Sequence, residues 1–478
     1  MGPLNCVLAV MIFMICGCAA QDYHIFCQYD LGSFYYKNES HVYTWNIDTR
    51  LCTHLVVGHG FGVNEETGEV KITDEFMLVK HVSFPFLFVG ILMDVSRLKM
   101  DSVKKILFTL GGWANGESRR LSEMIASPAK REKFYKSLTD FLSKWHLDGV
   151  QIDWRYPAKG SQPKDKENFV IFLEELHFAA QKHNFILMVA VLGRTDRQTL
   201  DGYNIPTIVK EADFVNLMLH DERDAHSRKL TYMAPLHGGE NSVEAAVKYW
   251  IKVGQAPKKL ILSIPLFLTS YTMDKKRFAV GSACKGPGKQ TPITRRPGFM
   301  TYSEWCLHMT NWALNFDKKL MVPYATRGNQ WVSFEDSRSL WPKMNIIKSN
   351  KLGGAMAWTI DADDFNGKCG EQYSQLRIIF TALGDQSALM TTAPTTVANG
   401  LCPRDGFQRD VWDCRLYHEC RNGERIYYEC LKGQFFDEKL EYCRPEKEVE
   451  CKQDFVIWRP GMPLYGIDNF PLNLKIVE

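Results

Sequence analysis

Short apolar stretches alternate with amphipathic ones along most of the chain. Eight stretches have the length and composition of buried strands: 23–29, 51–61, 105–113, 147–157, 186–192, 213–219, 260–267 and 353–360. Residues 128–145 and 168–183 carry apolar side chains at helical spacing. Strands that alternate with helices predict a parallel α/β fold. Eight such strands in a chain of 478 residues predict a TIM (β/α)8 barrel.

The stretch 147–157 differs from the other strands because its two faces differ in chemistry. Apolar residues alternate with an amide, an acid and a base at Gln151, Asp153 and Arg155. A Tyr-Pro pair is expected to end this strand. The acid and the base could form a structural ion pair in the core. Alternatively, they mark a functional site, because the strand ends of such barrels carry the chemistry.

The same stretch resembles the fourth-strand signature of glycoside hydrolase family 18, the chitinases, usually written D-G-x-D-x-D-W-E-Y-P. Six positions match: Asp148, Gly149, Asp153, Trp154, Tyr156 and Pro157. Gln151 replaces an acid that the family has, and Arg155 replaces the catalytic Glu, which protonates the glycosidic oxygen. Arginine stays charged at working pH and has no proton to give. The resemblance therefore implies the fold and argues against catalysis, with no catalytic residue left at this position.

Other barrel ends resemble the family in part. Residues 353–364 match its eighth strand, in which the residue at the position of Trp358 forms the floor of the sugar site. A core tryptophan is the competing interpretation. His220 replaces the tyrosine that holds the N-acetyl group, and we expect it to be a hydrogen-bonded polar residue rather than a pH-sensitive contact. The resemblance implies these sugar contacts in the barrel: Trp113, Asp153, Tyr156, Asp221 and Trp358.

Between the seventh and eighth predicted strands, about 269–345, the chain lacks a clean strand–helix rhythm. One subgroup of the family carries a small α+β insertion at this point. The resemblance therefore implies a barrel domain over 21–387 with such an insertion.

A formal net charge of +3 and the lack of a basic tract give no reason to expect a nucleic-acid partner. Residues 1–20 contain an apolar run that is too short to span a membrane, followed by small residues suited to cleavage. We read them as a signal peptide and expect a secreted, extracellular monomer. Asn38 begins a glycosylation acceptor sequence.

Six cysteines cluster near the C-terminus, after a Thr/Pro linker at 388–400. Their spacing, C-x11-C-x5-C-x9-C-x12-C-x7-C, resembles the peritrophin-A type chitin-binding domain of invertebrates, here over 401–452. About fifty residues build little core, so disulfides would hold this fold. Among its aromatic residues, we expect Tyr417, Tyr428 and Phe436 to contact chitin. The tail 453–478 matches neither module.

Cysteines in an oxidising compartment are expected to form disulfides, and the cluster lacks the paired C-x2-C spacing of a zinc site. No metal or other cofactor is expected. The two resemblances imply these pairs: Cys27–Cys52, Cys306–Cys369, Cys402–Cys420, Cys414–Cys451 and Cys430–Cys443. Cys284 remains outside them.

Both resemblances point to chitin or a chitooligosaccharide as the ligand. The first hypothesis is a secreted, non-catalytic chitinase-like lectin. The second is a weakly active chitinase with a relocated acid. The third is a chitinase-like signalling or growth-factor protein. The chitin-binding domain favours the first over the third, because a diffusing signal has no obvious need of a matrix anchor.

Overall fold

A computed structural model describes most of the barrel and parts of the C-terminal region. The described residues are 23–36, 41–76, 78, 91–100, 105–112, 117–155, 157, 164–220, 228–274, 280–384, 406–409, 416–421, 424–430, 434–437, 440 and 442–449. The expected signal peptide, Asn38, the linker 388–400 and the tail 453–478 lie outside these ranges. Predictions about them therefore stay predictions.

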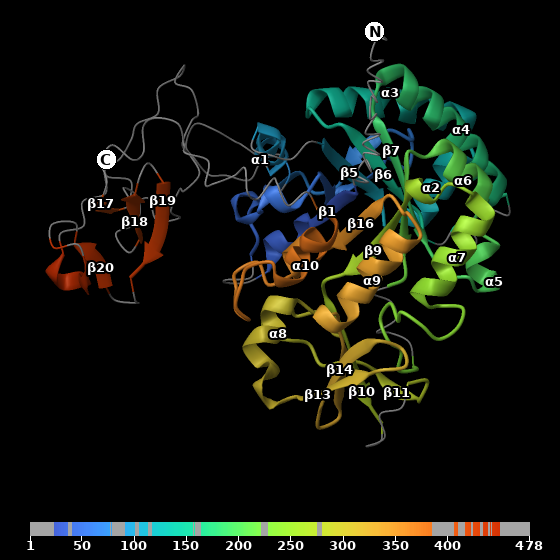
Figure 1. The fold of residues 1–478 in the computed structure, drawn as a ribbon. Helices are drawn as coiled ribbons and strands as arrows, with labels where there is room; N and C mark the ends of the chain where they lie inside the picture. The colour runs from blue at the N-terminus through green and yellow to red at the C-terminus, as the bar shows by residue number, and fades with distance from the viewer. Residues whose placement is uncertain are drawn as a thin grey trace, which may run out of the picture.

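Eight parallel strands close into a barrel, which confirms the predicted TIM fold (Figure 1). In order around the barrel they are β1 (His24–Asp30), β2 (His54–Gly58), β5 (Lys105–Gly111), β6 (Gly149–Asp153), β7 (Ile186–Leu192), β8 (Phe214–Met218), β9 (Leu260–Pro265) and β16 (Gly354–Trp358). The barrel closes where β16 pairs with β1, with Trp358 opposite Gln28. Nearly every strand residue is buried, as expected when both faces of a parallel sheet are covered.

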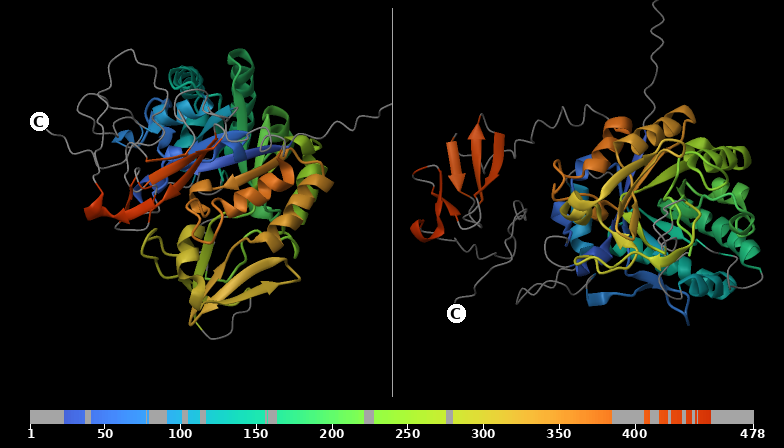
Figure 2. Two further views of the ribbon diagram at one scale, coloured as in Figure 1. Left: turned by 60° about the vertical axis from the view of Figure 1, so that its left-hand side comes forward. Right: turned by 90° about the horizontal axis from the view of Figure 1, so that it is seen from below.

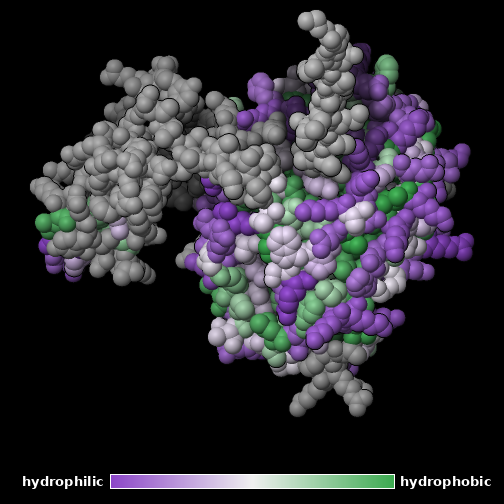
Figure 3. Space-filling view, in the orientation of Figure 1, coloured by the Kyte–Doolittle hydropathy of each residue, from purple (hydrophilic) through white to green (hydrophobic). Residues whose placement is uncertain are grey.

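Helices surround the barrel and cover the outer faces of its strands (Figure 2). They are α1 (Ile91–Arg97), α2 (Glu117–Ile125), α3 (Pro128–Lys144), α4 (Asp165–His183), α5 (Arg197–Leu200), α6 (Ile205–Glu211), α7 (Val243–Gly254), α9 (Ser337–Ser349) and α10 (Ser374–Leu383). Ser127 caps α3 by accepting a hydrogen bond from a backbone N–H of the first turn, and proline occupies the first helical position. Hydrophilic side chains dominate the helical face shown in Figure 3.

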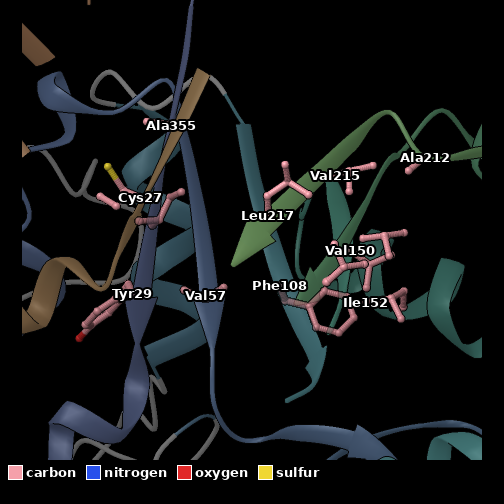
Figure 4. Close-up of a cluster of buried hydrophobic side chains, with 14 of the residues drawn as sticks. Cys27, Tyr29, Val57, Phe108, Val150, Ile152, Ala212, Val215, Leu217 and Ala355 are labelled. Atoms are coloured by element: carbon pink, nitrogen blue, oxygen red, sulfur yellow. The ribbon is translucent and has the colours of Figure 1, made fainter. Parts of the chain in front are cut away.

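The main core fills the layer between strands and helices. Val150 and Ile152 of β6 belong to it, together with Phe108 of β5 and Leu217 of β8 (Figure 4). Alternation along β6 therefore sends the apolar residues outward, toward the helices, and the polar residues inward. The strand is shorter than the predicted 147–157, because it ends at Asp153. Arg155 lies beyond the strand rather than within it.

An insertion lies between β9 and β16 and carries its own antiparallel sheet. Its strands are β10 (Leu268–Met273), β11 (Cys284–Pro287), β12 (Phe299–Met300), β13 (Ala313–Asp317), β14 (Val322–Arg327) and β15 (Gln330–Ser333). The helix α8 (Tyr302–His308) contains Cys306, which forms a disulfide with Cys369 in the segment after β16. A second disulfide, Cys27–Cys52, links β1 to the residues just before β2. Cys284 is buried and belongs to neither bridge.

The C-terminal region contains short antiparallel strands. They are β17 (Gly406–Arg409), β18 (Leu416–Arg421), β19 (Glu424–Glu429), β20 (Gln434–Asp437) and β21 (Tyr442–Pro445). The first three form one sheet, and the last two form a hairpin. Two further short strands, β3 (Phe61–Val63) and β4 (Val70–Ile72), pair beside the barrel. Among the residues placed by the structure, no helix combines the length and hydrophobicity needed to cross a membrane.

Candidate functional site

The carboxyl ends of three barrel strands bring together the sequence-predicted residues that the structure describes. Asp153 ends β6, Trp358 ends β16, and His220 follows β8 by two residues. Their exposed fractions are 1%, 6% and 1%. This end of a (β/α)8 barrel is where active sites lie, so the topology places the group at the expected position.

Asp153 and Arg155 form a buried ion pair. The Arg155 Nε atom lies 3.1 Å from both carboxylate oxygens, and its Nη2 atom lies 2.9 Å from Oδ2. Only 4% of the Arg155 side chain and 1% of the Asp153 side chain are exposed. Charge-assisted contacts of this kind hold both groups in one geometry. The carboxylate that the family resemblance assigns to sugar recognition is therefore bound to a neighbour in its own chain.

The Arg155 guanidinium also lies over the ring of Trp358, 5.3 Å from the ring centroid. This distance is within the range of a cation–π contact. One side chain thus links the end of β6 to the end of β16, where the sequence separation is about two hundred residues. The contact places a permanent cation on the ring that was predicted to be a sugar platform.

Tyr203 fixes the backbone that presents Arg155. Its hydroxyl lies 2.9 Å from the carbonyl oxygens of both Trp154 and Arg155. Burial raises the pKa of Tyr203, so the hydroxyl keeps its proton as a donor. The indole Nε1 of Trp154 donates to Ser118 Oγ at 2.9 Å, which turns this ring away from the mouth. The sequence pattern did not single out Tyr203, since nothing local relates it to β6.

A network of uncharged polar side chains lies inside the barrel and includes Gln151. The Gln151 Nε2 atom donates to Gln28 Oε1 at 3.2 Å and to Thr109 Oγ1 at 2.9 Å. Asn216 Nδ2 donates to Gln151 Oε1 at 3.1 Å. Amides and hydroxyls have no ionisable proton near neutral pH. This network therefore holds Gln151 in place without supplying the charge of the family's inner acid.

His220 is buried beside Trp358 as a neutral ring. Its Nε2 atom lies 2.8 Å from Ser263 Oγ, and its ring centroid lies 5.6 Å from that of Trp358. Burial lowers the pKa of His220 well below its usual value, and the nearby Arg155 and Arg194 act in the same direction. The hydrogen bond to Ser263 agrees with the expected role as a satisfied polar residue.

Three predicted sugar contacts of the barrel, Trp113, Tyr156 and Asp221, lie outside the described residues. Among the residues that are described, Cys306, Asp364 and Cys369 are the group whose geometry could bring three ligand atoms together. Both cysteines are disulfide-bonded, so neither offers the thiolate that a metal needs. The arrangement is structural.

In the C-terminal region the structure corrects one predicted chitin contact. Phe436 is fully buried, and its ring stacks on that of Tyr417 with centroids 4.0 Å apart. A small domain must use some aromatic residues as core, and Phe436 is one of them. Tyr417 remains partly exposed, Tyr428 has no described side chain, and Cys430 is disulfide-bonded. The pairing of Cys430 with Cys443, and the two pairs involving Cys402, Cys414, Cys420 and Cys451, stay predictions.

Comparison with family models matches residues 32–363 to "Glycosyl hydrolases family 18" and residues 402–451 to "Chitin binding Peritrophin-A domain". The first match covers more than half of the chain. The chain belongs to glycosyl hydrolase family 18. The strand-end residues described above therefore belong to a family 18 domain.

The family 18 relatives of this chain include named chitinases and a chitinase-like protein. Chitotriosidase-1 of Mus musculus is 29% identical over 83% of this chain and 90% of its own length. Chitinase-3-like protein 2 of Homo sapiens is 32% identical over 71% and 87%. The Group IV chitinase of Ostrinia furnacalis has a TM-score of 0.71 at 28% identity, covering 76% of this chain and all of its own.

The structure of human YKL-39 is similar at a TM-score of 0.67 and 29% identity, over 76% of this chain and all of its own. That protein is described as a pseudo-chitinase with retained chitooligosaccharide binding. Family membership thus fits both enzymes and proteins without the activity. The residues at the barrel mouth must decide between these two possibilities.

Proposed function

We propose that this protein is a secreted, non-catalytic family 18 protein that binds chitin or chitooligosaccharides without hydrolysing them. One observation carries the proposal: Arg155 stands two residues beyond Asp153, where the family signature has its proton donor, and is paired with that aspartate at 2.9 Å. A guanidinium stays charged at any working pH, so it cannot protonate a leaving group.

The interior of the barrel supports the same conclusion. A general acid needs a pKa near the operating pH, and family members with the full signature have a second acid at the position of Gln151. Here Gln151 forms hydrogen bonds with Gln28, Thr109 and Asn216, which are all uncharged. Restoring catalysis would therefore require more than one new carboxylate.

A relocated acid is the main alternative, and Asp361, in the segment after β16, is one candidate with a raised pKa. Burial and the neighbouring Asp30 raise the pKa of Asp361 well above its usual value. However, its Oδ1 atom accepts the backbone N–H of Asp30 at 2.8 Å, and only 2% of the residue is exposed. A buried carboxyl group that accepts a hydrogen bond from the backbone of β1 is poorly placed to reach a glycosidic oxygen.

The chitin-binding part of the proposal rests on the match of residues 402–451 to the Peritrophin-A domain. A second match, residues 32–363 to family 18, implies the same class of polysaccharide. A signalling role would not need a domain of this kind. Secretion is supported by the two disulfides of the barrel, which form in oxidising compartments.

Two assays on the full-length, oxidised protein test the proposal together. We expect retention on chitin beads and no hydrolysis of a fluorogenic chitooligosaccharide above a buffer blank. Turnover that survives purification and is abolished by Asp153→Asn would contradict the non-catalytic assignment. Failure to bind the beads would contradict the chitin-binding assignment.

A further inference from the structure

Trp358 ends β16, and the guanidinium of Arg155, from the segment after β6, lies over its ring. We infer that Arg155 occupies the sugar-stacking face of Trp358, so that the protein's own side chain closes the barrel mouth to chitooligosaccharides. This inference rests on the proposed function and assigns chitin binding to the C-terminal domain. Under this inference Trp358 holds an arginine of its own chain in place of a sugar ring. We call the Arg155 side chain in this position the plug.

A sugar ring and the Arg155 guanidinium would use the same face of Trp358. A pyranose ring binds an aromatic side chain by lying against its face, which is also where a guanidinium lies in a cation–π contact. Arg155 is 5.3 Å from the centroid of Trp358, and Trp358 is only 6% exposed. A sugar could reach this face only if Arg155 moved away from it.

The ion pair with Asp153 opposes such a movement. Two nitrogens of Arg155 contact the carboxylate at 2.9–3.1 Å, and the Tyr203 hydroxyl lies 2.9 Å from the Arg155 carbonyl oxygen. Rotating the guanidinium toward solvent would leave the Asp153 carboxylate buried without its cation. The plug is therefore anchored at both its side chain and its backbone.

Neighbouring side chains fill the mouth beside the plug. Phe267 stacks on Phe299 with centroids 5.1 Å apart, and the Arg296 guanidinium lies 4.1 Å from the Phe299 centroid. Phe267 also contacts the ring of His220, which in turn lies against Trp358. Phe267 and Phe299 are 2% and 8% exposed. Arg296 repeats, on a second ring, the arrangement of Arg155 on Trp358.

The test is a gain of binding. Isothermal titration of the full-length protein with chitotetraose is compared between wild type and Arg155→Ala. Because the C-terminal domain is the same in both proteins, its contribution cancels in the comparison. We expect Arg155→Ala to bind at least tenfold tighter, about 1.4 kcal/mol. Adding Trp358→Ala to Arg155→Ala should abolish the gain.

Two further variants keep the result interpretable. Asp153→Asn with Arg155→Ala removes the carboxylate charge together with its partner, so it opens the mouth even if Arg155→Ala alone fails to fold. Arg338→Ala is the matched control, because it removes an arginine from over an aromatic ring, that of Phe316 in the insertion, without uncovering Trp358. We expect it to leave chitotetraose affinity at the wild-type value.

The inference is overturned if folded Arg155→Ala and the double variant both bind chitotetraose no better than wild type. It is also overturned if the affinity of the otherwise wild-type chain falls on Trp358→Ala, since the platform would then already be in use. Either result leaves the proposed function standing, provided that the wild type is retained on chitin and hydrolyses nothing. Hydrolysis by the wild type would instead contradict the proposed function itself.

Discussion

Two buried ion pairs lie in different parts of this protein. Asp153–Arg155 is at the barrel mouth, with 1% and 4% of the side chains exposed. Glu335–Lys343 joins the segment after β15 to α9, and neither side chain is exposed at all. Both pairs join opposite charges away from water. Their burial is nearly the same, but their surroundings differ.

The Glu335–Lys343 pair is enclosed and serves the structure. Ser339 Oγ donates to the second carboxylate oxygen of Glu335 at 2.6 Å, which completes the set of partners. Burial raises the pKa of Glu335 and lowers that of Lys343, so each charge depends on the other. Asp153–Arg155, in contrast, ends a barrel strand and covers an aromatic ring. Burial alone is thus no sign of function, whereas position at the strand ends is.

The largest expected effect concerns catalysis, and it tests whether the mouth differs from an active site only by its acid. A placed general acid contributes about 10²–10⁴ in rate, or about 3–5 kcal/mol. We expect Arg155→Glu to stay near background, because Gln151 and His220 also depart from the family. Adding Gln151→Asp and His220→Tyr should increase turnover of a fluorogenic chitooligosaccharide.

The single variant could instead reach turnover within about tenfold of an ordinary family member, a gap of about 1.4 kcal/mol. That outcome would show that this mouth has lost only its acid. Melting curves of each variant separate a poor catalyst from an unfolded protein.

The next largest effect is on the free energy of unfolding, which we compare between variants of the two ion pairs. Removing one partner of a buried pair typically costs about 3–5 kcal/mol. We expect Lys343→Met to reach that range, because the Glu335 side chain is fully buried and would lose its cation. Arg155→Met should cost less, since removing the guanidinium that closes the mouth lets water reach the Asp153 carboxylate. Urea denaturation of both variants measures the difference.

An exposed pair on α5 and the residue after it provides the control for these two variants. Arg197 and Asp201 are 94% and 66% exposed in their side chains. Exposed pairs contribute at most about 1 kcal/mol, so Arg197→Met should be close to neutral. If Arg155→Met cost more than Lys343→Met, the mouth pair would be the more enclosed of the two, contrary to the comparison.

If the mouth is closed, retention on chitin must depend on the C-terminal domain. We expect Cys430→Ser, which breaks a disulfide there, to lower retention of the full-length protein on chitin beads by more than tenfold, about 1.4 kcal/mol. Cys284→Ser is the matched control, because Cys284 is buried in the insertion and belongs to neither barrel bridge. Equal retention of both variants would place the chitin contact in the barrel.

The smallest effect is a pH dependence of stability that comes from His220. Burial holds its folded-state pKa below the unfolded value of about 6.5, so below that pH the unfolded state binds a proton that the native state does not. The free energy of unfolding therefore falls on acidification, by at most about 1.4 kcal/mol per pH unit. His220→Asn should flatten this slope in urea denaturation between about pH 7 and 5.

The contribution of Asp363 to the pH dependence of stability has the opposite sign, so Asp363 is left unchanged in both proteins. Burial raises its pKa to about 6, so the native state gains a proton there as the pH falls, and this term favours the native state at acid pH. The difference between wild type and His220→Asn cancels that contribution. A slope that is the same in the two proteins would mean that His220 is protonated in the native state.

The sequence predicted the barrel well because its signals are local. The pattern of 186–192 corresponds to β7 residue for residue, and 128–145 differs from α3 by one position. Apolar runs, caps and family motifs all act over a few neighbouring residues. The strand over 147–157 was overextended, since alternation continues through Trp154 and Arg155 after the ladder has ended at Asp153.

The site was predictable in its members but not in its contacts. Local motifs named Asp153, Arg155 and Trp358, yet the position of one side chain over another, from β6 to β16, depends on closure of the barrel. Tyr203 was missed for the same reason. In the C-terminal domain, spacing identified aromatic residues but could not tell the buried Phe436 from an exposed ring.

The most direct test of the central claim is one incubation of the full-length wild-type protein with chitin beads, followed by measurement of both bound protein and soluble reducing ends. We expect the protein to be retained and the reducing ends to stay at the level of beads alone. Reducing ends that accumulate with time in proportion to protein, and that disappear in Asp153→Asn, would show that the barrel hydrolyses chitin despite Arg155.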